Sequence, residues 1–280
     1  MRAHAHIETK RREPWLFDDD ILRSVKLSIK MRYQLLPYLY TLFAENTLYS
    51  NPIMSPLFLV YPRVLELYQN SEKSFHLGDS LLVHPVTDAG INTHEIGFND
   101  RYYEYTSSGR ALEGVQTVNA TLYSMPGYLR QGRILPTWQR NRRSSELMHG
   151  DPLTLIIGLN KNGGAQGTLY MDDYETFEYM DGKYIYREFE YAAGTLKNRA
   201  IVVNKKISQI MGKYAKGQNK DNVAVHRENR VERIIVHGIN KVKSIKVKGG
   251  DKLHFEQYGD KLIVKDPKVL VKNDWEIVFE

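Results

Sequence analysis

Apolar residues recur at helical spacing between residues 21 and 43, and this period predicts a long helix near the start of the chain. Three consecutive aspartates, residues 18–20, precede it and offer a helix cap and acidic residues for the first turn, where negative charge is favoured. Pro37 lies inside the apolar pattern. Because proline lacks a backbone donor and clashes with the preceding turn, the helix should bend or divide there.

Two short apolar segments flank this helix and indicate strands. Residues 2–7, RAHAHI, are short enough for a buried strand, and residues 51–62, NPIMSPLFLVYP, indicate a second strand that ends in a loop. Strand, helix and strand in this order form the repeating unit of α/β folds. One such unit does not bury its own parallel sheet, since parallel strands need cover on both faces.

Beyond residue 78 the pattern changes to short strands separated by turns. Strands rich in Tyr, Val, Ile and Thr, with turn signals roughly every ten residues, are typical of β-sandwiches. We predict two hairpins over residues 167–191, with a tight turn at residues 181–182, and another hairpin with residues 259–260 at its tip. The last strand, residues 275–279, places its apolar residues alternately toward one face. The fold class predicted is therefore α/β followed by all-β.

The composition excludes several classes of site and protein. The 280 residues are 42% hydrophobic and 26% charged, which is ordinary for a globular protein, and the length suggests about two domains. No apolar run approaches the ~18 residues of a membrane span, and no secretory signal is visible after Met1. The absence of cysteine excludes disulfides, zinc–thiolate sites and thiol nucleophiles.

The net charge of +6 is unevenly distributed. Residues 197–248 hold fourteen Lys or Arg against three acids, a local charge of +11. One interpretation is a nucleic-acid-binding face. The other is a solvated surface of a β-rich domain with alternating lysines, as in VKSIKVKGG, and the lack of a recognition helix or aromatic platform favours it. Within this block the polar residues 212–222 indicate a mobile loop.

The first strand carries the clearest candidate chemistry. His4 and His6 share one face of a strand, and Glu8 extends that face. Three interpretations are open: a metal site like that of the metal-dependent amidohydrolases, neutral histidines that hydrogen-bond a polar substrate, and packed histidines with satisfied partners. The seven other histidines lie in or at the entrance of the β-rich part, which disfavours the metal site.

Charged and aromatic residues follow at once. Arg2 and the run from Arg11 to Glu13 are candidates for an ion network beneath a pocket. Pro14 should end the segment, and we expect Trp15 to pack beneath it.

No other stretch supplies a recognisable catalytic group. Residues 18–20 indicate a helix start and residues 172–173 a hairpin turn, which is the commoner fate of adjacent aspartates. There is no glycine-rich phosphate loop and no serine nucleophile motif. Asn119 begins an Asn-Ala-Thr glycosylation sequon, which permits a secretory-pathway location.

Six motifs occur in a fixed order along the chain. They are RAHAHIETKRREPW, RYQLLPYLYTLF, NPIMSPLFLVYP, HLGDSLLVHPVTDAG, LPTWQRNRRSSELMHGDPLTLIIGL and GAQGTLYMDDYETFEY. In this order they resemble the C-terminal part of family 31 glycoside hydrolases, and within that family the glucosidase II group of catalytic α-subunits. The resemblance covers nearly the whole chain and is weakest over residues 197–222.

The resemblance implies a fold and a division of the chain. It implies the last two βα units of a (β/α)₈ TIM barrel over residues 1–78, a proximal β-sandwich over 79–160 and a distal β-sandwich over 161–280. It also implies a retaining α-glucosidase that removes α-linked glucose from N-glycans in the endoplasmic reticulum. No cofactor is implied. The partners implied are the glucosylated glycan and a non-catalytic β-subunit.

The site residues implied by the resemblance lie at the start of the chain. The family's two catalytic aspartates lie on barrel strands before the stretch that matches Met1, so this chain alone should be inactive. By the Arg-x-His motif, His4 corresponds to the histidine that hydrogen-bonds glucose in the cleaved subsite, and Arg2 and His6 would support it. A non-catalytic carbohydrate-binding or scaffold protein is the alternative function.

The chain departs from the family's pattern at several positions. Ser55 stands where arginine is usual, and residues 94–100, HEIGFND, replace Val-Tyr-Leu-Pro. Gln131 replaces the first glycine of a Gln-Arg-Gly-Gly run, and Tyr174 replaces the glycine of an Asp-Asp-Gly turn. The loss of arginine at position 55 is the departure that we expect to affect the barrel.

Overall fold

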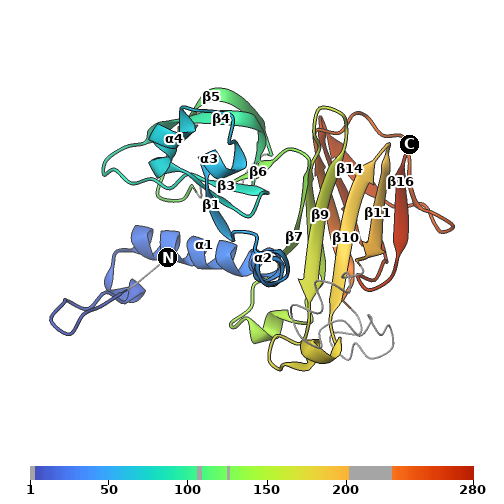
Figure 1. Ribbon diagram of the computed structural model, residues 1–280, viewed down its shortest axis with the longest axis horizontal. Helices are drawn as coiled ribbons and strands as arrows, with labels where there is room; N and C mark the ends of the chain where they lie inside the picture. Colours follow the sequence, from blue (N-terminus) through green and yellow to red (C-terminus); the bar gives the residue numbers. More distant parts are fainter. Residues whose placement is uncertain (1–3, 106–108, 125–126, 202–228) are drawn as a thin grey trace.

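The structure is a computed structural model that describes residues 4–105, 109–124, 127–201 and 229–280. Figure 1 shows two helices near the N-terminus, a smaller β body above them and a larger β body to their side. Strands make up most of the ordered elements. No helix among the described residues is long and apolar enough to cross a membrane.

The predicted long helix is present and is divided, as Pro37 suggested. Helix α1 begins after Asp18, whose side chain accepts a hydrogen bond from the Ile21 amide at 2.8 Å. Pro37 lies in the first turn of α2, where a missing backbone donor costs nothing. The helical segments are η1 (Pro14–Leu16), α1 (Asp19–Gln34), α2 (Leu36–Tyr49), α3 (Leu57–Val60), α4 (Leu67–Asn70), η2 (Ser71–Lys73), η3 (Glu146–Met148) and η4 (Glu178–Asp181).

The predicted parallel strand pair on either side of this helix is wrong. Among the described residues, 4–7 form no strand, and of the second segment only Met54–Pro56 is extended. That strand, β1, pairs antiparallel with β2 instead of lying beside a parallel neighbour. The residues after it, Leu57–Val60, form the helical turn α3. The predicted burial fails as well, since residues 4–7 are exposed and Met54 and Leu59 are 63% and 50% exposed.

The smaller β body is a six-stranded antiparallel sheet with the order β1-β2-β3-β6-β4-β5. Figure 1 shows α3 and α4 on this body. Its core contains buried aromatic and aliphatic side chains. The strands are β1 (Met54–Pro56), β2 (Phe75–Leu77), β3 (Leu81–Val83), β4 (Thr93–Glu104), β5 (Ala111–Asn119) and β6 (Gly127–Arg130).

The larger β body holds ten strands in the order β13-β16-β11-β10-β9-β7-β8-β12-β15-β14. Strands β7 and β9 are joined through one residue pair, Arg133 with Gln166, so that five strands lie on each side of this junction. One buried cluster draws residues from both sets of five. The strands are β7 (Arg133–Trp138), β8 (Leu153–Gly158), β9 (Ala165–Met171), β10 (Ile185–Ala192), β11 (Thr195–Ala200), β12 (Val231–His237), β13 (Ile245–Val247), β14 (Phe255–Tyr258), β15 (Lys261–Lys265) and β16 (Trp275–Phe279).

The junction of β7 and β9 requires a glycine. A Cβ placed on Gly167 would lie 2.1 Å from the Ile134 carbonyl oxygen, so any larger residue would push the two strands apart. The chain passes from the six-stranded to the ten-stranded sheet between Arg130 and Arg133. The division into sandwiches near residue 160 remains a prediction.

Of the three predicted hairpins, one is confirmed and two are wrong. Strands β14 and β15 pair with Tyr258 opposite Lys261, which confirms the turn at residues 259–260. The two hairpins over residues 167–191 are wrong, because β9 pairs directly with β10 and the segment between them contains η4. Gly182 caps that short helix at φ +85°. The tight turn lies instead between β10 and β11, where residues 193–194 both have positive φ.

The last strand is confirmed in its alternation. In β16 the side chains of Trp275, Ile277 and Phe279 are buried, and the two between them are half-buried. The polar loop predicted over residues 212–222 lies outside the described residues.

Helix α2 belongs to the core of the molecule. Tyr38 and Leu42 are buried in a cluster with Leu81 and Leu129 of the smaller sheet and Leu135 of the larger one. The helix is therefore the element that both sheets share.

A second contact fixes α2 on the larger sheet. The Thr41 hydroxyl accepts a hydrogen bond from the Tyr170 amide of β9 at 2.9 Å, and the same hydroxyl donates to the Pro37 carbonyl at 2.8 Å. The side chain of Thr41 is buried, so the contact replaces solvent for both groups.

Candidate functional site

The first candidate site lies in the segment that precedes the helices. His4 and His6 are exposed and form no strand, so they do not share a strand face. Residue 2, predicted to support them, lies outside the described residues. The turn around His6 is local: its amide donates to the Thr9 hydroxyl at 2.7 Å, and its carbonyl accepts from the Thr9 amide at 3.0 Å.

The ion network predicted for this segment is present only in part. Arg11 and Glu13 form an ion pair at 2.8 Å, and a guanidinium nitrogen of Arg12 donates to the His4 carbonyl at 3.4 Å. The pair with Glu13 raises the pKa of Arg11. Trp15 is 67% exposed, so the prediction that it packs beneath the segment that Pro14 ends is wrong. The cause is the absence of a facing layer among the described residues, because indole packing requires another surface.

A metal site needs several ligand side chains close together, and the structure shows how these side chains are spaced. Among the described residues, no three His, Cys, Asp or Glu side chains lie close enough together to hold a metal ion. The Nδ1 atom of His6 accepts a hydrogen bond from the Glu8 amide at 3.5 Å.

The glycosylation sequon lies at the end of β5. Asn119 is the last residue of this strand and is exposed, as is Thr121, whereas Ala120 between them is buried. An exposed asparagine at a strand end suits modification, and glycosylation there remains a prediction.

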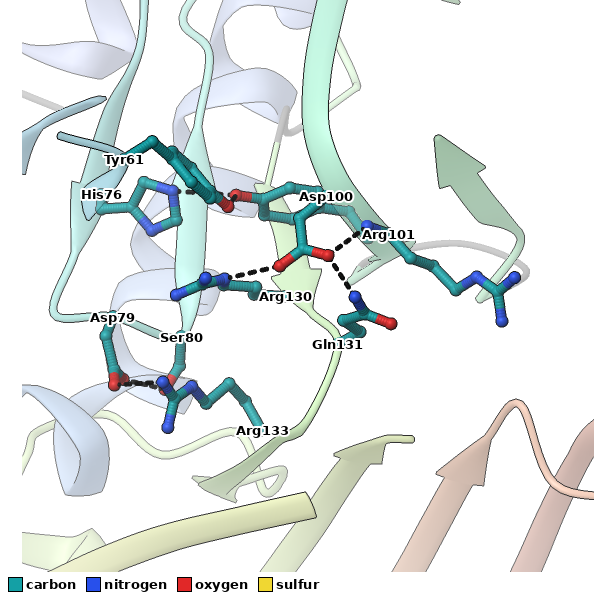
Figure 2. A network of polar contacts seen from close by, with 10 residues as sticks. Tyr61, His76, Asp79, Ser80, Asp100, Arg101, Arg130, Gln131 and Arg133 are labelled. Atoms are coloured by element: carbon teal, nitrogen blue, oxygen red, sulfur yellow. Dashed lines mark hydrogen bonds and ion pairs between the residues drawn. The ribbon is translucent and has the colours of Figure 1, made fainter. Parts of the chain in front are cut away.

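A second cluster of polar side chains lies inside the smaller β body, and Figure 2 shows it. The hydroxyls of Tyr61 and Tyr102 are 2.5 Å apart, and that of Tyr102 is 3.0 Å from Nε2 of His76. His76 and Tyr102 are buried. Burial lowers the pKa of His76 to about 4 and raises that of Tyr102. Both groups are therefore neutral near pH 7, and they form a hydrogen-bonded unit with the half-buried Tyr61.

An ion pair lies beside this unit at the end of β6 (Figure 2). The Nε atom of Arg130 is 3.1 Å from an Asp100 carboxylate oxygen, and the guanidinium lies over the Tyr61 ring at 4.9 Å. The Gln131 side-chain amide donates to Asp100 as well. The Arg101 backbone amide donates to the same carboxylate at 2.9 Å. Asp100 thus joins β4 to the residues that follow β6.

A third polar contact follows along the chain. Arg133 pairs with Asp79 at 2.8 Å, which connects the first residue of β7 to the turn between β2 and β3 (Figure 2). The sequence interpretation did not find this cluster. Its signals were two departures from the family's pattern: residues 94–100, which include Asp100, and Gln131, whose side chain supplies a contact that glycine lacks.

Tyr174, another departure from the family's pattern, has a backbone conformation that favours glycine. Its φ is +62°, in the left-handed region, where a non-glycine residue costs about 1–3 kcal/mol. Its ring packs at 4.5 Å from that of His149 and at 4.8 Å from that of Tyr40 of helix α2. Aromatic packing therefore opposes the backbone strain. Residues 172–173 lie in the long connection between β9 and β10 and not in the tight hairpin turn predicted for them, and their carboxylates accept hydrogen bonds from the Tyr174 and Glu175 amides at 2.8 and 3.1 Å.

Acidic side chains pair with some of the described basic residues of this block. Lys246 lies 2.7 Å from Glu280, and Lys248 lies 2.8 Å from Glu276. Arg199 lies 3.6 Å from Glu276 as well. These pairs favour a solvated β-sheet surface for residues 229–248, and most of the remaining block, 202–228, is outside the described residues.

Two family models match consecutive parts of the chain. The model described as "Glycosyl hydrolases family 31 TIM-barrel domain" matches residues 1–42, and "Glycosyl hydrolase family 31 C-terminal domain" matches residues 50–135. Together they include helix α1, the six-stranded sheet and the start of β7.

Curated proteins match nearly the whole chain. Neutral alpha-glucosidase AB of Dictyostelium discoideum is 33% identical over 99% of the chain, and glucosidase 2 subunit alpha of Saccharomyces cerevisiae is 32% identical over 100%. The chain spans 28% and 30% of the length of these two relatives.

Solved structures agree in fold. A crystal structure of an endoplasmic-reticulum glucosidase II heterodimeric complex, of catalytic subunit and the binding domain of the regulatory subunit, has a TM-score of 0.87 at 30% identity. It is matched over 100% of this chain and 31% of the matched chain. A family 31 dextranase of Flavobacterium johnsoniae shares the fold, with a TM-score of 0.72 at 21% identity over 96% of this chain and 34% of that chain.

Proposed function

The chain belongs to glycosyl hydrolase family 31, and we propose that it is the C-terminal part of a retaining α-glucosidase of the glucosidase II α-subunit type. One observation carries the proposal: relatives with α-glucosidase names match 99–100% of the chain, while the chain spans less than a third of their length. In the finer proposal, residues 1–78 are the end of a TIM barrel and two β-sandwiches follow.

The chemistry proposed for the whole enzyme needs groups that we do not assign in this chain. A retaining glycosidase uses a carboxylate nucleophile and a second carboxyl group that acts first as acid and then as base. The two groups must be held on either side of the glycosidic bond by a closed scaffold. The contribution proposed for this chain is a hydrogen bond from His4 to the glucose in the cleaved subsite, with Arg2 and His6 supporting it. The exposure of His4 leaves its ring accessible to a ligand.

Substrate, location and partner follow from the relatives and are proposals here. The substrate proposed is an N-glycan with α-linked glucose, processed in the lumen of the endoplasmic reticulum. The partner proposed is a non-catalytic subunit, because one structural relative is a complex with the binding domain of a regulatory subunit.

The first experiment tests the purified chain for turnover of a chromogenic α-glucoside. We expect no activity above that of a mock purification, because removal of catalytic groups costs several powers of ten in rate. Activity that an iminosugar inhibits would contradict the proposal that the catalytic pair lies outside this chain.

The second experiment tests His4 in a protein that joins this chain to the remaining barrel of a family 31 relative. His4→Ala should lower kcat/KM by about ten- to a thousandfold, the value of one preorganised hydrogen bond in a closed site. His254→Ala is the matched control, since His254 is exposed at the other end of the chain. An unchanged kcat/KM for His4→Ala would remove His4 from the site.

A further inference from the structure

A polar cleft of about 520 Å³ opens where helix α2 and the two sheets meet. Its walls come from α2, from residues 51–60, from the turn between β2 and β3, from residues 130–134 and from β9 and β10. This volume is typical of small-molecule sites. Neither His4 nor His6 lines the cleft, so it does not belong to the site proposed above.

The cleft has a fixed wall. The Tyr38 hydroxyl donates to the Leu77 carbonyl at 2.8 Å and accepts from the Ser80 amide at 3.3 Å. Gly78, with φ +56°, lies so close that a Cβ there would be 2.3 Å from the same hydroxyl oxygen. Ser55 is buried at 5% exposure beside this wall, and its short side chain leaves space that a long one would fill.

Hydrogen-bond donors and acceptors both line the cleft, and ion pairs or hydrogen bonds within the protein fix their positions. Arg133 is held by Asp79 at 2.8 Å and Arg130 by Asp100 at 3.1 Å. Both arginines are partly buried, and each offers further N–H donors.

The opposite wall supplies acceptors. Glu45 of α2 accepts from the Thr168 hydroxyl at 2.6 Å and from the Tyr186 hydroxyl at 2.9 Å, both through Oε1. These contacts fix the carboxylate and leave its Oε2 atom outside both bonds. Glu188, exposed on β10, adds a second carboxylate to the same side.

We propose that this cleft binds a single sugar ring. Each hydroxyl of a sugar both donates and accepts, and so can bridge fixed carboxylates and guanidinium groups, while the Leu42 and Val60 side chains offer apolar surface for its CH groups. Three carboxylates line the cleft against two arginines. A sugar with an ammonium group should therefore bind at least as well as a neutral sugar, and a sugar phosphate should bind least.

Ligand binding to the purified chain tests the proposal, with glucose, glucosamine and glucose 6-phosphate as probes in saturation-transfer NMR and calorimetry at pH 6. We expect binding of glucosamine and glucose and weaker binding of glucose 6-phosphate. No binding of either of the first two sugars, or tightest binding of the phosphate, would overturn the proposal.

Two residues of the same strand give a matched comparison of variants. Glu188→Gln should weaken glucosamine binding by about two- to fivefold, the value of one exposed charge interaction. Glu190→Gln should leave it unchanged, because Glu190 lies two residues further along β10 on the same face and does not line the cleft. Equal effects of the two substitutions would overturn the assignment.

A third variant closes the cleft. Ser55→Arg should fill the space beside Ser55 and abolish binding of both sugars. A circular-dichroism melt confirms that the variant is folded. Retention of binding by folded Ser55→Arg would place the sugar elsewhere and overturn the proposal.

Discussion

The first segment, residues 4–17, and helix α2 were both assigned to the same α/β unit, yet they differ completely in burial. None of residues 4–17 is buried, and Ile7 and Trp15 are 93% and 67% exposed. Helix α2 buries four side chains and contacts both sheets. The difference shows that membership of a predicted unit does not decide burial; the surfaces available within the chain decide it.

The same contrast extends through the first quarter of the chain. Among the described residues, eleven of the eighteen large exposed hydrophobic side chains lie between residues 7 and 68. Apolar side chains gathered in this way mark a surface that another layer covers. In the proposed family fold, the rest of the barrel would supply such a layer. Helix α2 is already covered by the two sheets.

The largest difference in stability should appear between two deletion proteins. Removal of residues 1–17 should leave the thermal midpoint almost unchanged, because none of the described residues 4–17 is buried. Removal of residues 1–49 should leave the chain largely unfolded, since each large core side chain contributes about 2–5 kcal/mol and a domain has only about 5–15 kcal/mol in total.

Circular-dichroism melts and size-exclusion chromatography measure both deletions. The packing of α2 implies that the β part from residue 78 onward is less stable alone than together with this helix. Equal stability of the two deletion proteins would contradict this.

A pair of adjacent residues repeats the comparison within one helix. Leu42→Ala should lower the free energy of unfolding by about 2–5 kcal/mol, because Leu42 is buried against both sheets. Phe43→Ala should change it by less than about 0.5 kcal/mol, since Phe43 is 58% exposed. Urea denaturation measures both values, and a larger loss for Phe43→Ala would show that this face is covered in solution.

Acid should lower the free energy of unfolding of the β bodies, because they contain buried histidines. Burial lowers the pKa of His237 to about 4, and the ring stacks on Tyr103 at 5.7 Å between centroids. Below pH 6.5 the unfolded chain binds a proton that the folded state excludes, so the contribution of His237 is complete above pH 6.5 and is lost toward pH 4. The expected loss at pH 5 is about 2 kcal/mol.

Urea denaturation at pH 7 and pH 5 measures this dependence. His237→Gln should flatten the pH dependence relative to the parent chain. His254→Gln should not, because His254 is exposed. An identical slope in all three proteins would mean that His237 is protonated in the folded state.

A smaller loss of stability than that of Leu42→Ala should arise at the start of α1. Asp18→Ala removes the cap that accepts from the Ile21 amide and should cost about 1 kcal/mol. Asp18→Asn, which keeps a capping oxygen, is the matched control. A loss beyond about 2 kcal/mol would mean that α1 contributes more to the core than its single buried side chain, Met31, suggests.

The sequence determined features with local causes. The cap at Asp18, the division of the helix at Pro37 and the alternation of β16 follow from side-chain and backbone chemistry within a few residues. The turn at residues 259–260 belongs to the same class. The family also followed from ordered motifs, and the comparisons confirm it.

The tertiary structure alone decided which strands pair and which residues are covered. Residues 4–7 form no strand, and β1 pairs antiparallel with β2. Strand pairing needs a neighbouring strand, and the spacing of apolar residues along one segment does not specify which strand that is. The sequence pattern likewise did not predict the polar cluster around Asp100, since Arg130 and Gln131 lie about thirty residues away along the chain. Such contacts depend on three-dimensional packing between distant segments, whereas caps, turns and alternation depend only on adjacent residues.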